Sequence, residues 1–180
     1  MNNKDKVFAH IDKSGLGLEI GPSYNPLAPK KEGYNVHIID HMSRDLLIEK
    51  YKGHHVSLEN IEEVDFVWSG ENFEYLTGKS KYYDYIIASH VIEHTPNLIG
   101  FLLNCDSVLK NNGVVSLVIP DKRYCFDYFR PISGISKIID SHYTDCKIHT
   151  PGSIAEYFLN VVAKAGNIAL CIHLPMQAVE

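Results

Sequence analysis

The sequence predicts an α/β fold with a doubly wound, mostly parallel sheet, and three observations support this prediction. Short apolar runs recur along the chain, several of them continuous and rich in Val and Ile, as strands buried on both faces of a parallel sheet require. Segments with helical periodicity lie between these runs, which predicts βαβ units with right-handed crossovers. The 180 residues, 45% of them hydrophobic, can form one sizeable core and most simply one domain.

Five apolar runs have the length of strands and alternate with candidate helices along the first two thirds of the chain. We expect the sheet to consist of these runs, which are Leu16 to Ile20, Val36 to Ile39, Val64 to Trp68, Tyr85 to Ala88 and Val114 to Ile119.

Two segments between these runs are predicted helices. Asp45 to Tyr51 is short and charged, whereas Asn97 to Lys110 has apolar residues at spacings of three and four. Pro96 stands near the start of the second segment, and Asn111-Asn112-Gly113 follows it with residues that tolerate a left-handed backbone.

The pattern changes beyond Pro120. Asp121 to Tyr143 is polar and aromatic and is interrupted by Pro131 and Gly134. Ser153 to Lys164 has its apolar residues on one side of a predicted helix. The segment Ile168 to Leu174 fits either a sixth strand or the continuation of a helical insert.

Composition excludes several classes of function. The formal net charge of −5 provides no broadly basic surface, so nucleic acid is not an expected partner. No apolar run approaches the roughly 18 residues of a membrane span, and the N-terminus has no signal-peptide core. The four cysteines lie far apart without a CxxC pair, which suggests neither a zinc ribbon nor a disulfide framework and fits a cytoplasmic protein.

Polar residues at the ends of the first two strands form the most informative pattern of the chain. Glu19 ends the first strand, where its carboxylate can face a cationic ligand, and Gly21 allows a sharp turn and close approach of the backbone. Pro22 and Ser23 continue this turn. Asp40 follows Gly21 by nineteen residues and ends the second strand, where it can accept hydrogen bonds from ribose hydroxyls.

Two further pairs of polar residues follow strands at the edge of the sheet where ligands bind in open α/β folds. Glu71 and Asn72 follow the third strand and can meet an adenine amino group, and Ser89 and His90 follow the fourth strand at the expected crevice. Each residue alone is more simply explained as a solvated strand end. Their joint order predicts an adenosine-bearing cofactor, and the absence of a clear phosphate clamp favours S-adenosylmethionine over a dinucleotide.

Four motifs in order carry a resemblance to a known family. The segments EIGPSYNP, HIID, YYDYIIASHVIEHTPN and LKNNGVVSLVIPD resemble the successive motifs of class I S-adenosylmethionine-dependent methyltransferases, over about residues 15 to 125. The resemblance implies a Rossmann-like sheet, S-adenosylmethionine as cofactor, S-adenosylhomocysteine as product, and a small-molecule or sugar acceptor. Similar domains work in polysaccharide biosynthesis, among other pathways.

The sequence departs from the family pattern in two places. Ser23 and Asn25 replace the second and third glycines of the first motif, so the first helix is expected to start late or to be replaced by a loop. The family sheet has seven strands, whereas five are expected here with at most one more. We therefore expect one domain over 1–180, with a core of about 15–125 and a lid or insert over 121–180 in which the last strands are compressed or missing. Missing strands leave a sheet edge that a homodimer would cover.

The expected catalytic residues follow the fourth and fifth strands. His90 is the first candidate for a base, because an imidazole titrates near neutrality, and Asp121 is the second; a hydrogen-bonded loop histidine is the alternative role for His90. Lys122 and Arg123 can recognise an anionic acceptor or simply lie at the surface. Glu93 and His94 more simply hold the loop or cap the next helix. The aromatic segment Tyr124 to Phe129, with Arg130 and Tyr143, is the expected acceptor lid.

Three other interpretations compete with this one. His90-Val-Ile-Glu93-His94 satisfies the H-x-x-E-H zinc pattern, but Pro96 disfavours the long helix that such a site needs, so no metal is expected. A nicotinamide-dependent dehydrogenase needs a glycine-rich phosphate cradle, which Pro22 and Pro26 compromise. A methyltransferase-like domain without catalytic activity is the third alternative.

Overall fold

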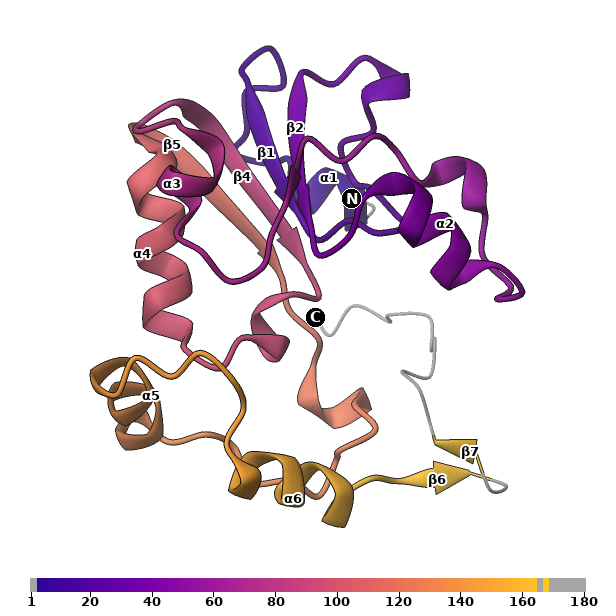
Figure 1. Ribbon diagram of the computed structural model, residues 1–180, viewed down its shortest axis with the longest axis vertical. Coiled ribbons are helices and arrows are strands. Elements are labelled where there is room, and N and C mark those ends of the chain that lie inside the picture. Colours follow the sequence, from indigo (N-terminus) through magenta and orange to yellow (C-terminus); the bar gives the residue numbers. More distant parts are fainter. Residues whose placement is uncertain (1–2, 165–166, 169–180) are drawn as a thin grey trace.

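A parallel sheet forms the body of the protein (Figure 1). The computed structural model describes residues 3–164 and 167–168. The sheet has five parallel strands in the order β3-β2-β1-β4-β5. They are β1 (Gly17–Ile20), β2 (Val36–Asp40), β3 (Phe66–Val67), β4 (Tyr83–Ser89) and β5 (Leu109–Val118). The predicted α/β fold is confirmed, and each of the five expected runs overlaps one of these strands.

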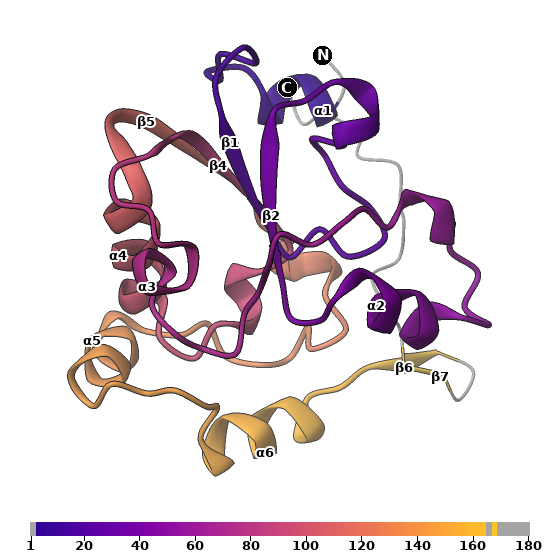
Figure 2. The same ribbon diagram turned by 45° about the horizontal axis from the view of Figure 1, so that its top comes forward.

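Helices lie on both faces of this sheet, as a doubly wound fold requires (Figures 1 and 2). The α-helices are α1 (Asn3–Val7), α2 (Arg44–Tyr51), α3 (Phe73–Thr77), α4 (Leu98–Val108), α5 (Ile135–Tyr143) and α6 (Pro151–Leu159). The 3₁₀ turns are η1 (Lys30–Glu32), η2 (Leu58–Asn60), η3 (Ile92–His94) and η4 (Lys122–Tyr124). Among the described residues, no helix has the length and apolar character needed to cross a membrane.

Strand β1 lies at the centre of the sheet and is buried on both faces. Leu18 and Ile20 pack in one cluster with Phe101 of α4. On the opposite face, Tyr85 of β4 packs with Phe8, which follows α1. Both faces of β1 are therefore covered, as expected for the central strand of a parallel sheet.

The connection from β1 to β2 contains no α-helix. Residues 21–35 form a loop with the single 3₁₀ turn η1, so the second of the two expected outcomes, replacement by a loop, is the one observed. The predicted helix Asn97 to Lys110 is present but ends at Val108, where β5 begins directly. Asn111-Asn112-Gly113 lie inside a bulge of β5, because pairing with β4 shifts between Leu109 and Val114.

Residues 121–162, hereafter the strap, run across the molecule opposite the carboxyl ends of the strands (Figures 1 and 2). The strap contains α5, which the sequence analysis did not predict, and α6, which corresponds to the predicted helix Ser153 to Lys164 but ends at Leu159. Beyond the strap, β6 (Ala163–Lys164) and β7 (Asn167–Ile168) form an antiparallel pair. Of the predicted segment Ile168 to Leu174, all but Ile168 lies outside the described residues.

Candidate cofactor site

The turn after β1 adopts a backbone that few residues tolerate. Gly21 has φ of 64° and Ser23 has φ of 53°, both in the left-handed region. A Cβ on Gly21 would also lie 3.1 Å from Cγ2 of Val91. For Ser23 this conformation costs of order 1 kcal/mol or more, and strain of this kind gathers at functional sites. The first motif therefore forms a tight turn although its second glycine is a serine.

Glu19 ties the loop after β1 to the sheet. Its side chain is 1% exposed, and its two carboxylate oxygens accept the backbone N–H groups of Leu27 at 2.7 Å and Ala28 at 3.1 Å. Burial raises the pKa of Glu19 to about 7, against the opposing effect of these two hydrogen bonds. The predicted role of Glu19 toward a cationic ligand stays a prediction, because both oxygens bind the chain itself.

Asp40 occupies the end of β2 and is 2% exposed. Its Oδ2 accepts the N–H of Ser23 at 2.8 Å. Its Oδ1 accepts the N–H of His41 at 2.7 Å and lies 2.6 Å from Nδ1 of the same residue. Asp40 thus joins the ends of β1 and β2, and its predicted contact with ribose hydroxyls stays a prediction.

Glu71 and Asn72 follow β3 and hold their own local structure. The Glu71 carboxylate accepts the N–H of Ser69 at 2.8 Å. Asn72 caps α3 by accepting the N–H of Glu74 at 2.8 Å, and its amide donates to Asn104 of α4 at 2.7 Å. Both side chains are therefore positioned by contacts within the chain, and their predicted contact with adenine stays a prediction.

Ser89 and His90 lie at the end of β4, next to the end of β5. Ser89 pairs with Val118, and the N–H of His90 donates to the carbonyl of Val118 at 2.9 Å. His90 also has a left-handed backbone, with φ of 55°. Its imidazole is 52% exposed, and its Nδ1 lies 3.3 Å from Oε1 of Glu93.

Asp121, the second predicted catalytic residue, follows β5 and has a different partner. Its carboxylate accepts hydrogen bonds from the N–H and the guanidinium of Arg123, with 2.5 Å to Nη2. These hydrogen bonds lower the pKa of Asp121 to about 2. The structure therefore pairs His90 with Glu93 and Asp121 with Arg123, and an Asp121 carboxylate held in this way is a weak base.

Glu93 contacts His90, and no catalytic role is predicted for Glu93 from the sequence. The sequence predicts for Glu93 a role in capping the next helix or in holding the loop. Its position three residues after His90 was a signal, because one turn of helix brings such residues together. The turn η3 does so here, and His94 at its end accepts through its carbonyl the Nε2–H of His149 at 2.9 Å.

The geometry also bears on the two enzyme alternatives. The H-x-x-E-H segment forms a single 3₁₀ turn preceded by a left-handed residue, so His90 and His94 do not share a face of an α-helix. Among the described residues no group of three His, Cys, Asp or Glu side chains is arranged to hold a metal ion. No helix N-terminus follows β1 to hold a pyrophosphate, which argues against a dinucleotide cofactor.

The residues around Asp40 fit a ribose-bearing cofactor. Ser23 Oγ is buried and has no hydrogen-bond partner within the described part of the chain, although buried hydroxyls almost always have one. Ser23 is joined to Asp40 through its N–H. A carboxylate oxygen can accept more than one hydrogen bond. The two side chains can therefore bind ligand hydroxyl groups together.

Comparison with known sequences decides the family. Residues 2–161 match the sequence model of the family described as "Methyltransferase domain". The chain belongs to this methyltransferase family. The match confirms the family that the four motifs predict, the S-adenosylmethionine-dependent methyltransferases. A search of curated proteins found no match.

Two solved structures are similar to this methyltransferase. One is a SAM-dependent methyltransferase from Archaeoglobus fulgidus, with 18% identity and a TM-score of 0.47, and the match covers 87% of this chain and 65% of that one. The other is a putative sarcosine dimethylglycine methyltransferase from Galdieria sulphuraria, with 16% identity and a TM-score of 0.47, and it covers 87% and 67%. The chain thus spans about two thirds of the length of these two structures.

Proposed function

We propose that the chain binds S-adenosylmethionine at the carboxyl ends of β1, β2 and β4 and transfers its methyl group to a small-molecule or carbohydrate acceptor. The observation that supports this most directly is the buried Ser23 hydroxyl without a partner next to Asp40. In this proposal Asp40 and Ser23 bind the ribose, Gly21 and Pro22 form the turn against the ligand, and Glu71, Asn72 and Ser89 line the rest of the site.

His90 is the proposed base. When bound, S-adenosylmethionine would supply a methyl group on a positively charged sulfur. The acceptor oxygen would bond to the methyl carbon, and the sulfur–carbon bond would break with its electron pair left on sulfur, giving S-adenosylhomocysteine. A proton on Nδ1 of His90 would point toward Glu93, 3.3 Å away, which leaves Nε2 to accept the proton of an acceptor hydroxyl. Asp121 has a lesser role here, because Arg123 already binds its carboxylate.

The proposal extends to the setting of the protein. We propose one functional domain over 1–180 that works in the cytoplasm, in polysaccharide biosynthesis or a related pathway; the separated cysteines support this compartment. A homodimer through β5 is also proposed. Within the described residues, β5 pairs only with β4, so its outer edge can meet a second copy. Sedimentation as a monomer at micromolar concentration would contradict the dimer.

A non-catalytic role is the second candidate, and one observation favours it. The oxygens of Glu19 and Asp40, the two acids that the family motifs contribute, already accept backbone N–H groups. In a domain that binds no cofactor, these hydrogen bonds would be the whole function of the two acids.

Titration calorimetry with S-adenosylmethionine and S-adenosylhomocysteine separates the two candidates. We expect micromolar binding of both ligands, weakened at least tenfold in Asp40→Asn, since a good hydrogen bond to a charged group contributes about 1.5–3 kcal/mol. Asp45→Asn on exposed α2 is the matched control and should bind normally. Circular dichroism checks that Asp40→Asn is folded. Absence of binding heat with the folded wild-type protein would favour the non-catalytic domain.

A further inference from the structure

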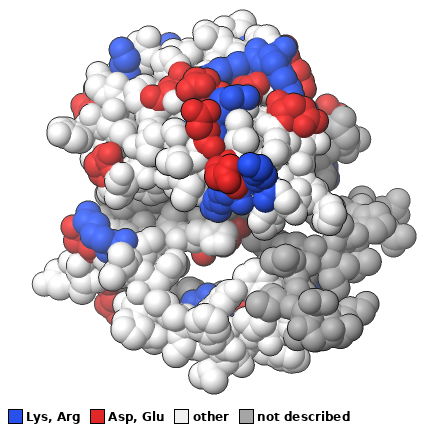
Figure 3. Space-filling view, turned by 45° about the vertical axis from the view of Figure 1, so that its right-hand side comes forward, with Lys and Arg blue, Asp and Glu red and all other residues white. Residues whose placement is uncertain are grey.

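A cavity of about 510 Å³ lies between the strap and the segment from η3 to the start of α4. One wall comes from η3 and the start of α4, with Glu93, Pro96 and Leu98. The other wall comes from the strap, with residues such as Ser136 of α5 and Ser153 of α6. Figure 3 shows the hollow between the two parts. Its volume is that of a small-molecule site.

The position of this cavity connects it to the proposed base. Glu93 lines the cavity and is also the side chain that faces Nδ1 of His90. A molecule held in the cavity can therefore contact Glu93, which joins the cavity to His90, although His90 itself is not in the lining. The aromatic residues of the expected lid do not line the cavity: Tyr128 and Tyr143 are 51% and 88% exposed. Of that expected lid, Arg130 is in the lining.

Hydroxyl groups are the most frequent polar groups of the lining. Ser133, Ser136 and Ser141 contribute hydroxyls that make no hydrogen bond to another described residue; Ser133 and Ser136 are exposed and Ser141 is half-buried, so all three are open to water or a ligand. Each hydroxyl can both donate and accept. Such a surface is complementary to a ligand that itself has several hydroxyl groups. When a serine hydroxyl meets a ligand hydroxyl, either of the two can donate the hydrogen bond and the other can accept it.

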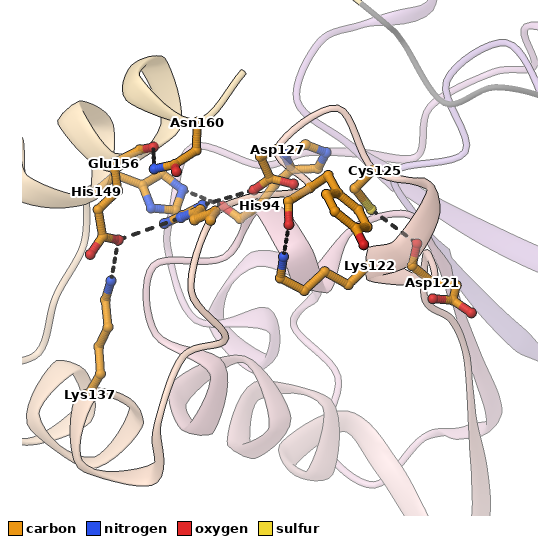
Figure 4. A network of polar contacts seen from close by, with 11 residues as sticks. His94, Asp121, Lys122, Cys125, Asp127, Lys137, His149, Glu156 and Asn160 are labelled. Carbon is orange, nitrogen blue, oxygen red and sulfur yellow. Dashed lines mark hydrogen bonds and ion pairs between the residues drawn. The ribbon is translucent and has the colours of Figure 1, made fainter. Parts of the chain in front are cut away.

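The cations around the cavity are already paired. Arg130 lies 3.6 Å from Asp127 and 3.5 Å from Glu156, and Lys137 lies 3.2 Å from Glu156 (Figure 4). The lining also contains Glu93 and Asp140. A bound anion would therefore face two carboxylates and would have to compete with Glu156 for both cations.

The other two cations expected to recognise an anionic acceptor are engaged as well. Lys122 donates to the carbonyl of Tyr128 at 2.6 Å, and Arg123 binds Asp121 (Figure 4 shows Lys122 and Asp121). Lys122 also lies 5.7 Å from the ring centre of Tyr128. Neither Lys122 nor Arg123 is in the lining of the cavity.

We propose that this cavity is the acceptor site and that it selects a neutral, polyhydroxylated molecule, such as an uncharged sugar, over sugar acids and sugar phosphates. The inference rests on the proposed function for the role of the cavity in methyl transfer. The selectivity follows from the cavity alone: unpartnered hydroxyls provide the contacts, and paired cations with two lining carboxylates disfavour anions.

Saturation-transfer NMR with four probes tests this site. The neutral probes are methyl β-D-glucopyranoside and methyl α-D-mannopyranoside, and the anionic probes are glucuronic acid and glucose 6-phosphate, each with and without S-adenosylhomocysteine. We expect at least one neutral probe to bind at least tenfold more tightly than both anions. Ser141→Leu and, separately, Ser136→Leu project a larger apolar side chain into the cavity and should weaken binding tenfold or more. Ser57→Leu, exposed and outside the cavity, is the matched control and should change nothing.

The outcomes separate this inference from the proposed function. Tighter binding of an anion, no binding of either neutral probe, or neutral binding unaffected by both cavity variants would each overturn the inference. Calorimetry with S-adenosylhomocysteine on the same samples tests the proposed function independently. Cofactor binding without sugar binding would overturn only the acceptor site, and sugar binding without cofactor binding would overturn only the methyl transfer.

Discussion

The carboxylates at the end of the sheet and those of the strap are held in two different ways. Glu19 and Asp40 are almost completely buried and accept hydrogen bonds from backbone N–H groups. Asp121 and Glu156 are more than 40% exposed and pair with arginine and lysine side chains. Backbone donors keep a fixed position, whereas long cationic side chains can change rotamer. The difference indicates that the sheet end is preorganised for one ligand geometry and that the strap can adjust.

Apolar side chains show the same contrast. Strands β1 and β4 bury theirs on both faces, but Ile132, Tyr143 and Leu159 of the strap are 81%, 88% and 83% exposed. Little apolar area therefore holds the strap to the body, and we expect it to open at a lower free energy than the sheet unfolds. Under the proposed function, a preorganised cofactor site beside an adjustable acceptor wall would let the acceptor enter and leave.

Two glycine substitutions, one in each region, test this contrast most strongly. A Cβ on Gly17 would lie 2.2 Å from Cε2 of Tyr85, inside the buried sheet. Gly17→Ala should lower the free energy of unfolding by about 3 kcal/mol. Gly152→Ala in α6 meets nothing closer than 3.9 Å and should leave the main transition within about 0.5 kcal/mol of wild type. Urea denaturation followed by the fluorescence of Trp68, the single tryptophan, measures both. A cost of more than 1 kcal/mol for Gly152→Ala would show that body and strap unfold together.

Because the carboxyl group of Glu19 is buried, we expect the free energy of unfolding to depend on pH near neutrality, and we expect no such dependence from the strap. Its pKa of about 7 is raised from 4.5, so between these values the folded state binds a proton that the unfolded state has lost. The stability from this group is complete below pH 4.5 and is lost as the pH rises through 7, by about 2 kcal/mol between pH 5 and 7. The lowered pKa of Asp121 has the opposite sign, and its stabilisation is lost only as the pH falls toward 2.

Urea denaturation at pH 5, 6 and 7 measures the contribution of Glu19 by comparing wild type with Glu19→Gln. The glutamine keeps one acceptor and cannot ionise, so the difference between the two proteins should change by about 2 kcal/mol over this range. Asp121→Asn is the matched control in the strap, and its difference from wild type should stay constant. A constant difference for Glu19→Gln would mean that Glu19 is already ionised at pH 5 and that burial does not dominate its pKa.

The same contrast explains which parts of the molecule could be predicted from sequence. The strands of the body were predictable because continuous apolar runs have a direct meaning in a parallel sheet. Helix α5 was missed because Pro131 and Gly134 suggested an interrupted segment, whereas Gly134 is the N-cap of a helix that starts after it.

The partners of the acids were not predictable. Glu19 binds Leu27 and Ala28 through the fold of a loop that no periodicity describes. The pairing of His90 with Glu93 combines the left-handed backbone of His90 with the turn η3 that follows it, and neither could be read from the sequence.

The smallest expected effect concerns the ion pairs of the strap. Glu156 faces Arg130 and Lys137, so Glu156→Gln removes both pairs and leaves the hydrogen bond from Asn160 to its backbone carbonyl in place. Exposed pairs contribute little and are screened by salt. Hydrogen exchange of residues 130–160 should therefore become only about two- to fivefold faster, and 1 M salt should produce the same change in the wild type. Glu49→Gln removes an exposed pair with Lys52 in the body and should leave exchange in the strap unchanged. An increase of a hundredfold or more in the exchange rate would mean that the ion pairs of Glu156, and not the packing of the strap on α4, hold the strap in place. The strap would then be as preorganised as the end of the sheet.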